Sequence, residues 1–139
     1  MTYDIISTRR FKKELRIKQP IDIFFIVKKY AKSRQEQFLL LTLNGAHAVI
    51  AIHIVTIGIA NRTIIHPREI FYHAIKDNAC ALAFAHNHPT GELEASQNDE
   101  EITERLVKAS KIMGFHIVDH IIFNKRNWFS MRENGFSFN

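Results

Sequence analysis

Apolar and polar positions repeat with two different periods along the chain, and together they predict alternating helices and strands. Apolar residues recur at helical spacing over 21–31, directly after Pro20. The same spacing returns over 67–76, where Pro67 suits the first helical position. It appears again over about 97–113, where an apolar stripe lies opposite a charged one and Gly114 provides a stop. We therefore expect three main helices.

Shorter apolar runs between these helices predict strands. Residues 38–43 form such a run, and Asn44-Gly45 predicts a two-residue type I′ turn into a returning strand over 46–57. Gly58 breaks that strand, and residues 61–63 (Asn-Arg-Thr) predict a polar turn. Further strands are expected over 79–85, 115–123 and 128–131, with a turn over 124–127. The order α-β-β-α-β-α-β-β predicts one α/β domain with a mixed β-sheet flanked by helices.

Composition narrows the class of protein. A chain of 139 residues with 46% hydrophobic and 24% charged content is typical of one globular domain. It contains no apolar run long enough to cross a bilayer and no signal peptide, so we expect no membrane partner. The single cysteine excludes an internal disulfide framework and favours a cytoplasmic location. The sequence does not determine the oligomeric state.

The N-terminal part is basic. The net charge is +5, and residues 9–18 contain six cations and one acid. Arg9, Arg10, Lys12 and Lys13 offer a weak contact to DNA phosphates. A solvated arm or edge segment is the commoner meaning of a short charge run, and we favour it. We accordingly divide the chain into a basic N-terminal segment, 1–19, and a domain, 20–139.

The strongest chemical signal lies over residues 86–99. His86 and His88 end a predicted strand, where residues two apart point to the same side and can reach one ion. Asp99 follows after a loop that can fold back on them. Two imidazoles and one carboxylate, with a fourth position left to water, are typical of catalytic zinc. Such a water has its pKa lowered to about 7.

The same residues have a simpler interpretation. Ser96 followed by Asp99 resembles a helix N-cap with an acid in the first turn, and residues 87–91 form a reasonable plain turn. Neither feature requires a metal. The two interpretations are compatible, because a capped helix is a rigid mount for a ligand.

The pattern His-x-His, seven residues, Ser, two residues, Asp resembles the JAMM (MPN+) metalloprotease motif. Residues 85–91 (Ala-His-Asn-His-Pro-Thr-Gly) are similar to the RadC branch of that family, which usually has serine where this chain has Thr90. The resemblance begins at about residue 20 and includes further short segments: Glu36-Gln37-Phe38, His66-Pro67-Arg68-Glu69, Asn78-Ala79 and Asp119-His120. It implies a JAMM/MPN-like fold of cytidine-deaminase-like architecture. Longer RadC-type proteins carry an N-terminal helix-hairpin-helix-like region, for which we expect no room here.

The resemblance also implies a function. It indicates a zinc-dependent hydrolase of peptide or isopeptide bonds, with a peptide or protein substrate and with His86, His88 and Asp99 as zinc ligands. By the same carry-over, Glu36 is the general base and Ser96 assists the developing oxyanion. Judged by its surroundings alone, Glu36 is an exposed acid in the polar loop 33–37.

Other reactive residues give weaker signals. His120, beside Asp119, either supports the site, lines the cleft or faces solvent. We interpret His47, His53, His73 and His116 as structural or surface residues. Cys80 is expected to behave as a small hydrophobe within a strand. One cysteine also excludes a zinc deaminase, which needs a pair of them.

Two alternatives to a hydrolase stay open. One is a DNA-associated accessory protein of the RadC DNA-repair type without proteolytic turnover, supported by the basic N-terminus. The other is a scaffold that binds the metal and lacks turnover, because a complete set of ligands does not prove a substrate.

Overall fold

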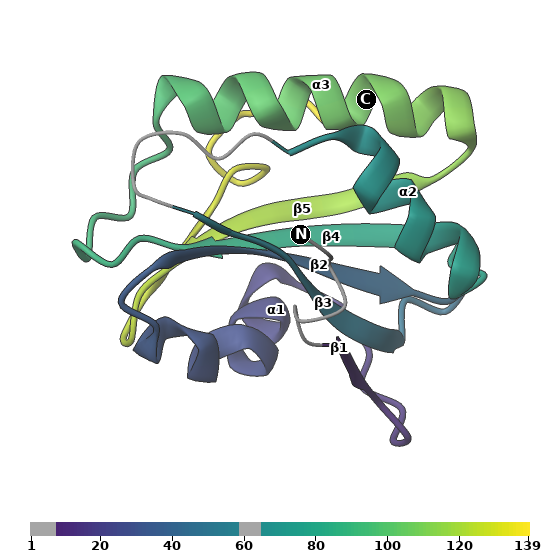
Figure 1. The fold of residues 1–139 in the computed structure, drawn as a ribbon, viewed down its shortest axis with the longest axis horizontal. Helices are drawn as coiled ribbons and strands as arrows, with labels where there is room; N and C mark the ends of the chain where they lie inside the picture. The colour runs from purple at the N-terminus through teal and green to yellow at the C-terminus, as the bar shows by residue number, and fades with distance from the viewer. Residues whose placement is uncertain (1–7, 59–64) are drawn as a thin grey trace.

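The computed structural model describes residues 8–58 and 65–139. Six strands form one sheet in the order β1-β3-β2-β4-β5-β6 (Figure 1). The neighbours β4 and β5 run parallel, and the other neighbouring pairs run antiparallel. The strands are β1 (Thr8–Arg10), β2 (Glu36–Leu43), β3 (Val49–Gly58), β4 (Ala81–Asn87), β5 (His116–Phe123) and β6 (Trp128–Ser130).

Helices cover both faces of this sheet. The helix α1 (Pro20–Val27) and the short 3-10 helix η2 (Lys28–Lys32) lie on one face. The helices α2 (Pro67–Lys76) and α3 (Gln97–Met113) lie on the other (Figure 1). The predicted α/β domain with a mixed, helix-flanked sheet is therefore confirmed. In the described ranges, no helix combines the length and the apolar character needed to cross a membrane.

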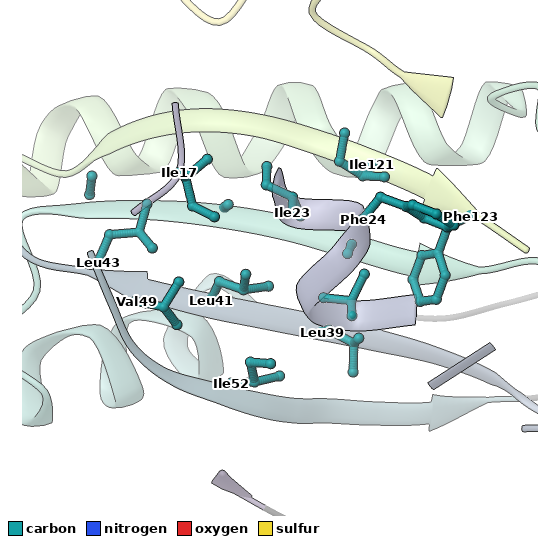
Figure 2. Close-up of a cluster of buried hydrophobic side chains, with 14 of the residues drawn as sticks. Ile17, Ile23, Phe24, Leu39, Leu41, Leu43, Val49, Ile52, Ile121 and Phe123 are labelled. Carbon is teal, nitrogen blue, oxygen red and sulfur yellow. The ribbon is translucent and has the colours of Figure 1, made fainter. Parts of the chain in front are cut away.

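Two hydrophobic cores hold the three layers together. Leu39, Leu41 and Leu43 of β2 lie in one core cluster with Ile23 and Phe24 of α1, and Leu43 is at the end near Ile17 (Figure 2). The alternate residues of β2 point to the other core, with residues of α2 and α3. Each fully buried aliphatic side chain contributes roughly 1.5–3 kcal/mol. Because both faces of the central strands are covered, these strands are continuous apolar runs rather than alternating ones.

The hairpin between β2 and β3 forms where we predicted it, but its turn is not type I′. Neither Asn44 nor Gly45 has a positive φ, whereas His47 has φ 62°. Asn44 accepts hydrogen bonds through Oδ1 from the backbone N–H groups of Ala46 and Ala48. This side chain favours a three-residue loop with its left-handed residue last, which is the next most common hairpin connection.

Several predicted boundaries also shift. The α-helix predicted over 21–31 ends at Val27 and continues as η2. The strand predicted over 79–85 is Ala81–Asn87, so that Cys80 lies outside the strand and is exposed, contrary to our expectation. The edge strand β1 was not predicted, because its three residues are exposed and show no apolar pattern. The turn predicted over 61–63 lies outside the described residues.

Candidate metal centre

The carboxyl end of β4 brings the two histidines together. His86 is the penultimate residue of β4, and His88 follows the strand directly. Their Nε2 atoms lie 2.8 Å apart. The two side chains therefore point the same way, as the i, i+2 spacing predicted.

The N-terminus of α3 delivers Asp99 to the same point. Ser96 is the N-cap, and its Oγ accepts a hydrogen bond from the Asp99 N–H at 3.0 Å. The Asp99 carboxylate accepts one in return from the Ser96 N–H at 2.8 Å, which completes a capping box. Asp99 Oδ1 lies 3.2 Å from His86 Nε2, and Oδ2 lies 3.4 Å from His88 Nε2. The helix cap and the candidate ligand are thus one arrangement.

Strand pairing brings Glu36 to the site from fifty residues earlier in the chain. Glu36 is the first residue of β2, and Phe38 of that strand pairs antiparallel with His86. Continuing this register by two residues, toward the start of β2, places Glu36 opposite His88. Glu36 Oε1 lies 3.7 Å from His88 Nε2. Potential ligand atoms of Glu36, His86 and His88 all lie within 4.8 Å of one another, so these side chains form a candidate metal-binding cluster.

Hydrogen bonds to the far side of each imidazole determine which nitrogen carries a proton. Thr103 Oγ1 donates to the Asp99 carbonyl at 2.7 Å, so it accepts from His120 Nδ1–H at 2.6 Å. His120 Nε2 then accepts from His86 Nδ1–H at 2.7 Å. His88 Nδ1 donates to the Glu92 carbonyl at 2.9 Å. In the neutral histidines, both Nε2 atoms therefore carry lone pairs directed into the cluster.

This arrangement fits a bound cation. The two Nε2 lone pairs and the Asp99 carboxylate are all acceptors, and they converge within 3.4 Å. Acceptors that close repel one another unless a positive charge lies among them. Ligands of one tetrahedral zinc ion lie about 3.3–3.6 Å apart, which is close to the two separations from Asp99. The donor set of two imidazoles and a carboxylate, with supporting hydrogen bonds behind it, therefore suits a divalent metal.

The pKa shifts agree with this electrostatic reading. Burial lowers the pKa of His88, but the hydrogen bond and charge of Asp99 outweigh it, and the pKa is raised overall. For Asp99, burial raises the pKa, yet the hydrogen bonds and charges of the two histidines hold it well below its usual range. Asp99 thus stays ionised, and the cluster attracts positive charge.

An open cleft gives access to the cluster. Its volume is about 370 Å³, and its walls include Glu36, His88, Ser96 and Asp99. Ser96 is exposed, and its Oγ accepts the hydrogen bond from the Asp99 N–H, so its hydroxyl proton is left to donate to another group. A water or a substrate carbonyl can therefore approach the predicted ligands, base and oxyanion donor together.

Two further residues support the site, and only one of them, His120, was named as a candidate from the sequence. Asn87 is buried between the histidines and points the other way, where its Oδ1 accepts from the Gln37 N–H at 2.7 Å. Its Nδ2 donates to the carbonyls of Ser33 and Gln35, which holds the segment carrying Glu36 against β4. The His-x-His alternation was the available signal for Asn87, since strand geometry turns the residue between the two histidines away from their side. His120, left open by the sequence, is fully buried and supports His86.

Asp119 and His120 have separate tasks. Adjacent strand residues face opposite sides of a sheet. Asp119 accepts hydrogen bonds from Ser130 Oγ and from the Arg132 N–H, so it anchors the segment around β6 rather than the metal cluster. Burial raises the pKa of Asp119, opposed by these hydrogen bonds.

A second polar cluster is buried elsewhere on the sheet. Asp77, after α2, has a side chain only 1% exposed and lies 2.6 Å from His53 Nε2. It accepts hydrogen bonds from Thr42 Oγ1 at 2.8 Å and from the Arg10 guanidinium at 3.0 Å. The ring of His73 stacks on that of His53. This cluster joins β1, β2, β3 and α2, consistent with our structural interpretation of both histidines.

The cations proposed to contact DNA lie on or beside the edge strand β1. All four, Arg9, Arg10, Lys12 and Lys13, are exposed. The charge of Arg10 is offset by Asp77, and the Arg9 guanidinium lies over the ring of Phe11.

Comparison with known proteins gives the same family that the motif suggested. The family described as RadC-like JAB domain matches residues 17–136. Similar proteins, named UPF0758 protein, include one from Methanospirillum hungatei that is 41% identical over 127 residues, covering 90% of this chain and 56% of its own length. One from Alkaliphilus metalliredigens is 40% identical, covering 85% of this chain and 51% of its own. One from Clostridium botulinum is also 40% identical, covering 92% of this chain and 59% of its own length.

The chain spans between half and three fifths of the length of these relatives. The match nevertheless includes the whole cluster from Glu36 to Asp99, together with His120. On this sequence, this fold and this arrangement of side chains, the chain belongs to the RadC-like JAB domain family.

Proposed function

We propose that this domain is a zinc-dependent metallohydrolase that cleaves a peptide or isopeptide bond. The observation that carries the proposal is the convergence of three acceptor groups, from His86, His88 and Asp99, beside Glu36 in an open cleft. Three protein ligands with room for a further one are typical of catalytic rather than structural zinc.

The donor set defines what the residues would do. His86, His88 and Asp99 would hold the ion, and their supporting hydrogen bonds keep both imidazoles in the required tautomer. Zinc, when bound, supplies the Lewis acidity that makes water a nucleophile at neutral pH and polarises a carbonyl. The choice of zinc rather than magnesium follows from the imidazole nitrogens.

The remaining residues handle protons and charge. Glu36 lies 3.7 Å from His88 Nε2, close enough to accept a proton from a water held in the cleft. After the oxygen of this water bonds to the carbonyl carbon, Glu36 returns the proton to the leaving amine as the C–N bond breaks. The Ser96 hydroxyl donates to the carbonyl oxygen as negative charge develops on it.

Metal analysis tests the proposal. Protein purified without chelators is expected to contain about one zinc ion per chain, and His88→Ala is expected to lose it. His116→Gln is the matched control. His116 pairs with Ala81 at the start of β4, whereas His86 lies near the end of that strand, so this variant is expected to keep the zinc. Absence of zinc, with no rebinding of added zinc, would contradict the proposal.

The alternative is a DNA-associated accessory role without turnover. In its favour, Arg9, Lys12 and Lys13 are exposed together near one sheet edge. Against it, Arg10 is engaged by Asp77. This alternative predicts salt-sensitive retention on DNA that weakens when these cations are neutralised. No retention at low salt would exclude it.

A further inference from the structure

A second hollow adjoins the predicted catalytic cleft on the other side of His88. Its volume is about 340 Å³, and the turn between β5 and β6 lines it with Asn124, Lys125, Arg126 and Asn127. The loop after β4 contributes His88 and two further residues, Pro89 and Gly91. His88 and Pro89 line both hollows, so a bound substrate can extend from one into the other.

Hydrogen bonds fix this turn relative to the metal cluster. Asn124 Oδ1 accepts from the backbone N–H groups of Arg126 and Asn127, each at 2.8 Å. Asn124 Nδ2 donates to the Gly91 carbonyl at 2.9 Å, and the His88 N–H donates to the Phe123 carbonyl at 3.2 Å. The turn over 124–127 is therefore hydrogen-bonded to the loop that carries His88, and this fixes the position of the hollow relative to the metal cluster.

The charge of this hollow is opposite to that of the cleft. Its lining contains two cations, Lys125 and Arg126, and no acid. Across residues 8–58 and 65–139, no ion pair involves either of these side chains. The cleft, by contrast, is lined by three acids, Glu36, Glu92 and Asp99. A substrate lying across His88 thus meets negative charge on one side and positive charge on the other.

We propose that this hollow binds a carboxylate of the substrate peptide, close to the bond that is cleaved. The inference rests on the proposed peptidase function and adds a substrate class, peptides with an acidic side chain or a free C-terminus beside that bond. A guanidinium fork, an ammonium group and amide N–H groups match the planar carboxylate and its lone pairs. A nucleic-acid strand suits the hollow less well, because its described lining contains no phenylalanine, tyrosine or tryptophan for base stacking.

Binding can be measured without relying on turnover. The probes are three matched compounds, N-acetyl-glutamate α-amide, N-acetyl-glutamine and N-acetyl-glutamine amide, added to ¹⁵N-labelled full chain carrying its zinc. The first offers a side-chain carboxylate, the second a terminal one, and the third none. We expect amide signals of residues 124–127 to shift with the first or the second probe and not with the third. Which of the two shifts them identifies the source of the carboxylate.

Charge-removing variants complete the test. The double variant Lys125→Gln, Arg126→Gln is expected to weaken binding of the preferred probe at least about tenfold, because it loses charge-assisted hydrogen bonds to the carboxylate. Lys108→Gln with Lys111→Gln removes the same charge from exposed positions on α3 and is expected to bind like the wild type. Unchanged binding by the first variant overturns the proposal. The proposal is also overturned if an oligothymidylate shifts the amide signals of residues 124–127 and neither carboxylate probe shifts them.

The two proposals fail separately. Zinc content and hydrolysis are measured on the same samples. Carboxylate binding at residues 124–127 without zinc or turnover contradicts the peptidase function alone. Zinc and turnover without carboxylate binding contradict the carboxylate subsite alone.

Discussion

Glu36 shows how one residue depends on its neighbours for a chemical role. A glutamate at the start of a strand is ordinarily solvated, but this one lies in the cleft with its side chain only 16% exposed. Asn87 holds the strand in place through hydrogen bonds to residues 33, 35 and 37. Asn87 therefore serves as a positioning residue for the predicted base.

The substitution Glu36→Gln tests that base directly. The amide has nearly the same shape and cannot accept the proton, so hydrolysis of a mixed pool of internally quenched peptides should fall roughly 10²–10⁴-fold. Zinc content should stay near that of the wild type, since the three predicted ligands, His86, His88 and Asp99, remain.

Glu104→Gln is the control for this measurement, because Glu104 is exposed on α3 and pairs only with Lys108 among the residues described. Equal turnover by Glu36→Gln and the wild type would remove Glu36 from the mechanism. Zinc binding by the wild type without hydrolysis of any substrate would favour the scaffold alternative.

At the scale of an element, α3 combines a structural and a chemical task at its first turn. The capping box between Ser96 and Asp99 satisfies backbone N–H groups that a helix start leaves free. The same box orients the Asp99 carboxylate toward both histidines. At the other end, Gly114 ends the helix with φ 86°, a conformation that other residues rarely adopt.

Substitutions of Ser96 separate the two tasks. Ser96→Ala removes the cap and should lower the free energy of unfolding by about 1 kcal/mol, measured by urea denaturation. Ser96→Asn restores a good cap and should recover most of that stability. Turnover should fall by about 10²-fold in Ser96→Ala if the hydroxyl donates to the oxyanion, whereas the side-chain N–H of Ser96→Asn can replace that donor. Full turnover in Ser96→Ala would leave only the capping role.

At the scale of the whole molecule, the buried Asp77 cluster couples stability to pH. Burial, followed by the neighbouring charge of His53, lowers the pKa of His73 from 6.5 to about 4. Between these values the unfolded chain binds the proton and the folded chain does not. The stabilising contribution is therefore complete above pH 6.5 and is lost as the pH falls toward 4. Burial lowers the pKa of His53 as well, with the same sign.

Urea denaturation between pH 4 and pH 7.5 checks this dependence. The free energy of unfolding should decrease toward the acidic end, by at most about 1.4 kcal/mol per pH unit for one proton, and by less because His73 is partly exposed. His73→Phe keeps an aromatic ring against His53 and should show a flatter profile than the wild type. An identical slope in the two proteins would exclude His73 as the source.

The sequence by itself determined the features that depend on neighbouring residues. Periodicity identified the three helices and the main strands, since the direction of a side chain follows from local backbone geometry. For the same reason, His-x-His and Ser-x-x-Asp could each be recognised as a unit. The turn after β2 was mistaken because the Asn44 side chain, rather than the Asn-Gly pair alone, decided its conformation.

Only the tertiary structure decided how these units meet. The antiparallel register of β2 and β4 brings Glu36 to His88, and a chain of hydrogen bonds links His86 to His120 on β5 and to α3. The basic turn over 124–127 reaches the far side of His88 in the same way. No local window contains these contacts, because strand order and register depend on the packing of the whole sheet. The candidate ligands could thus be selected from spacing, whereas the position of Glu36 beside them could not.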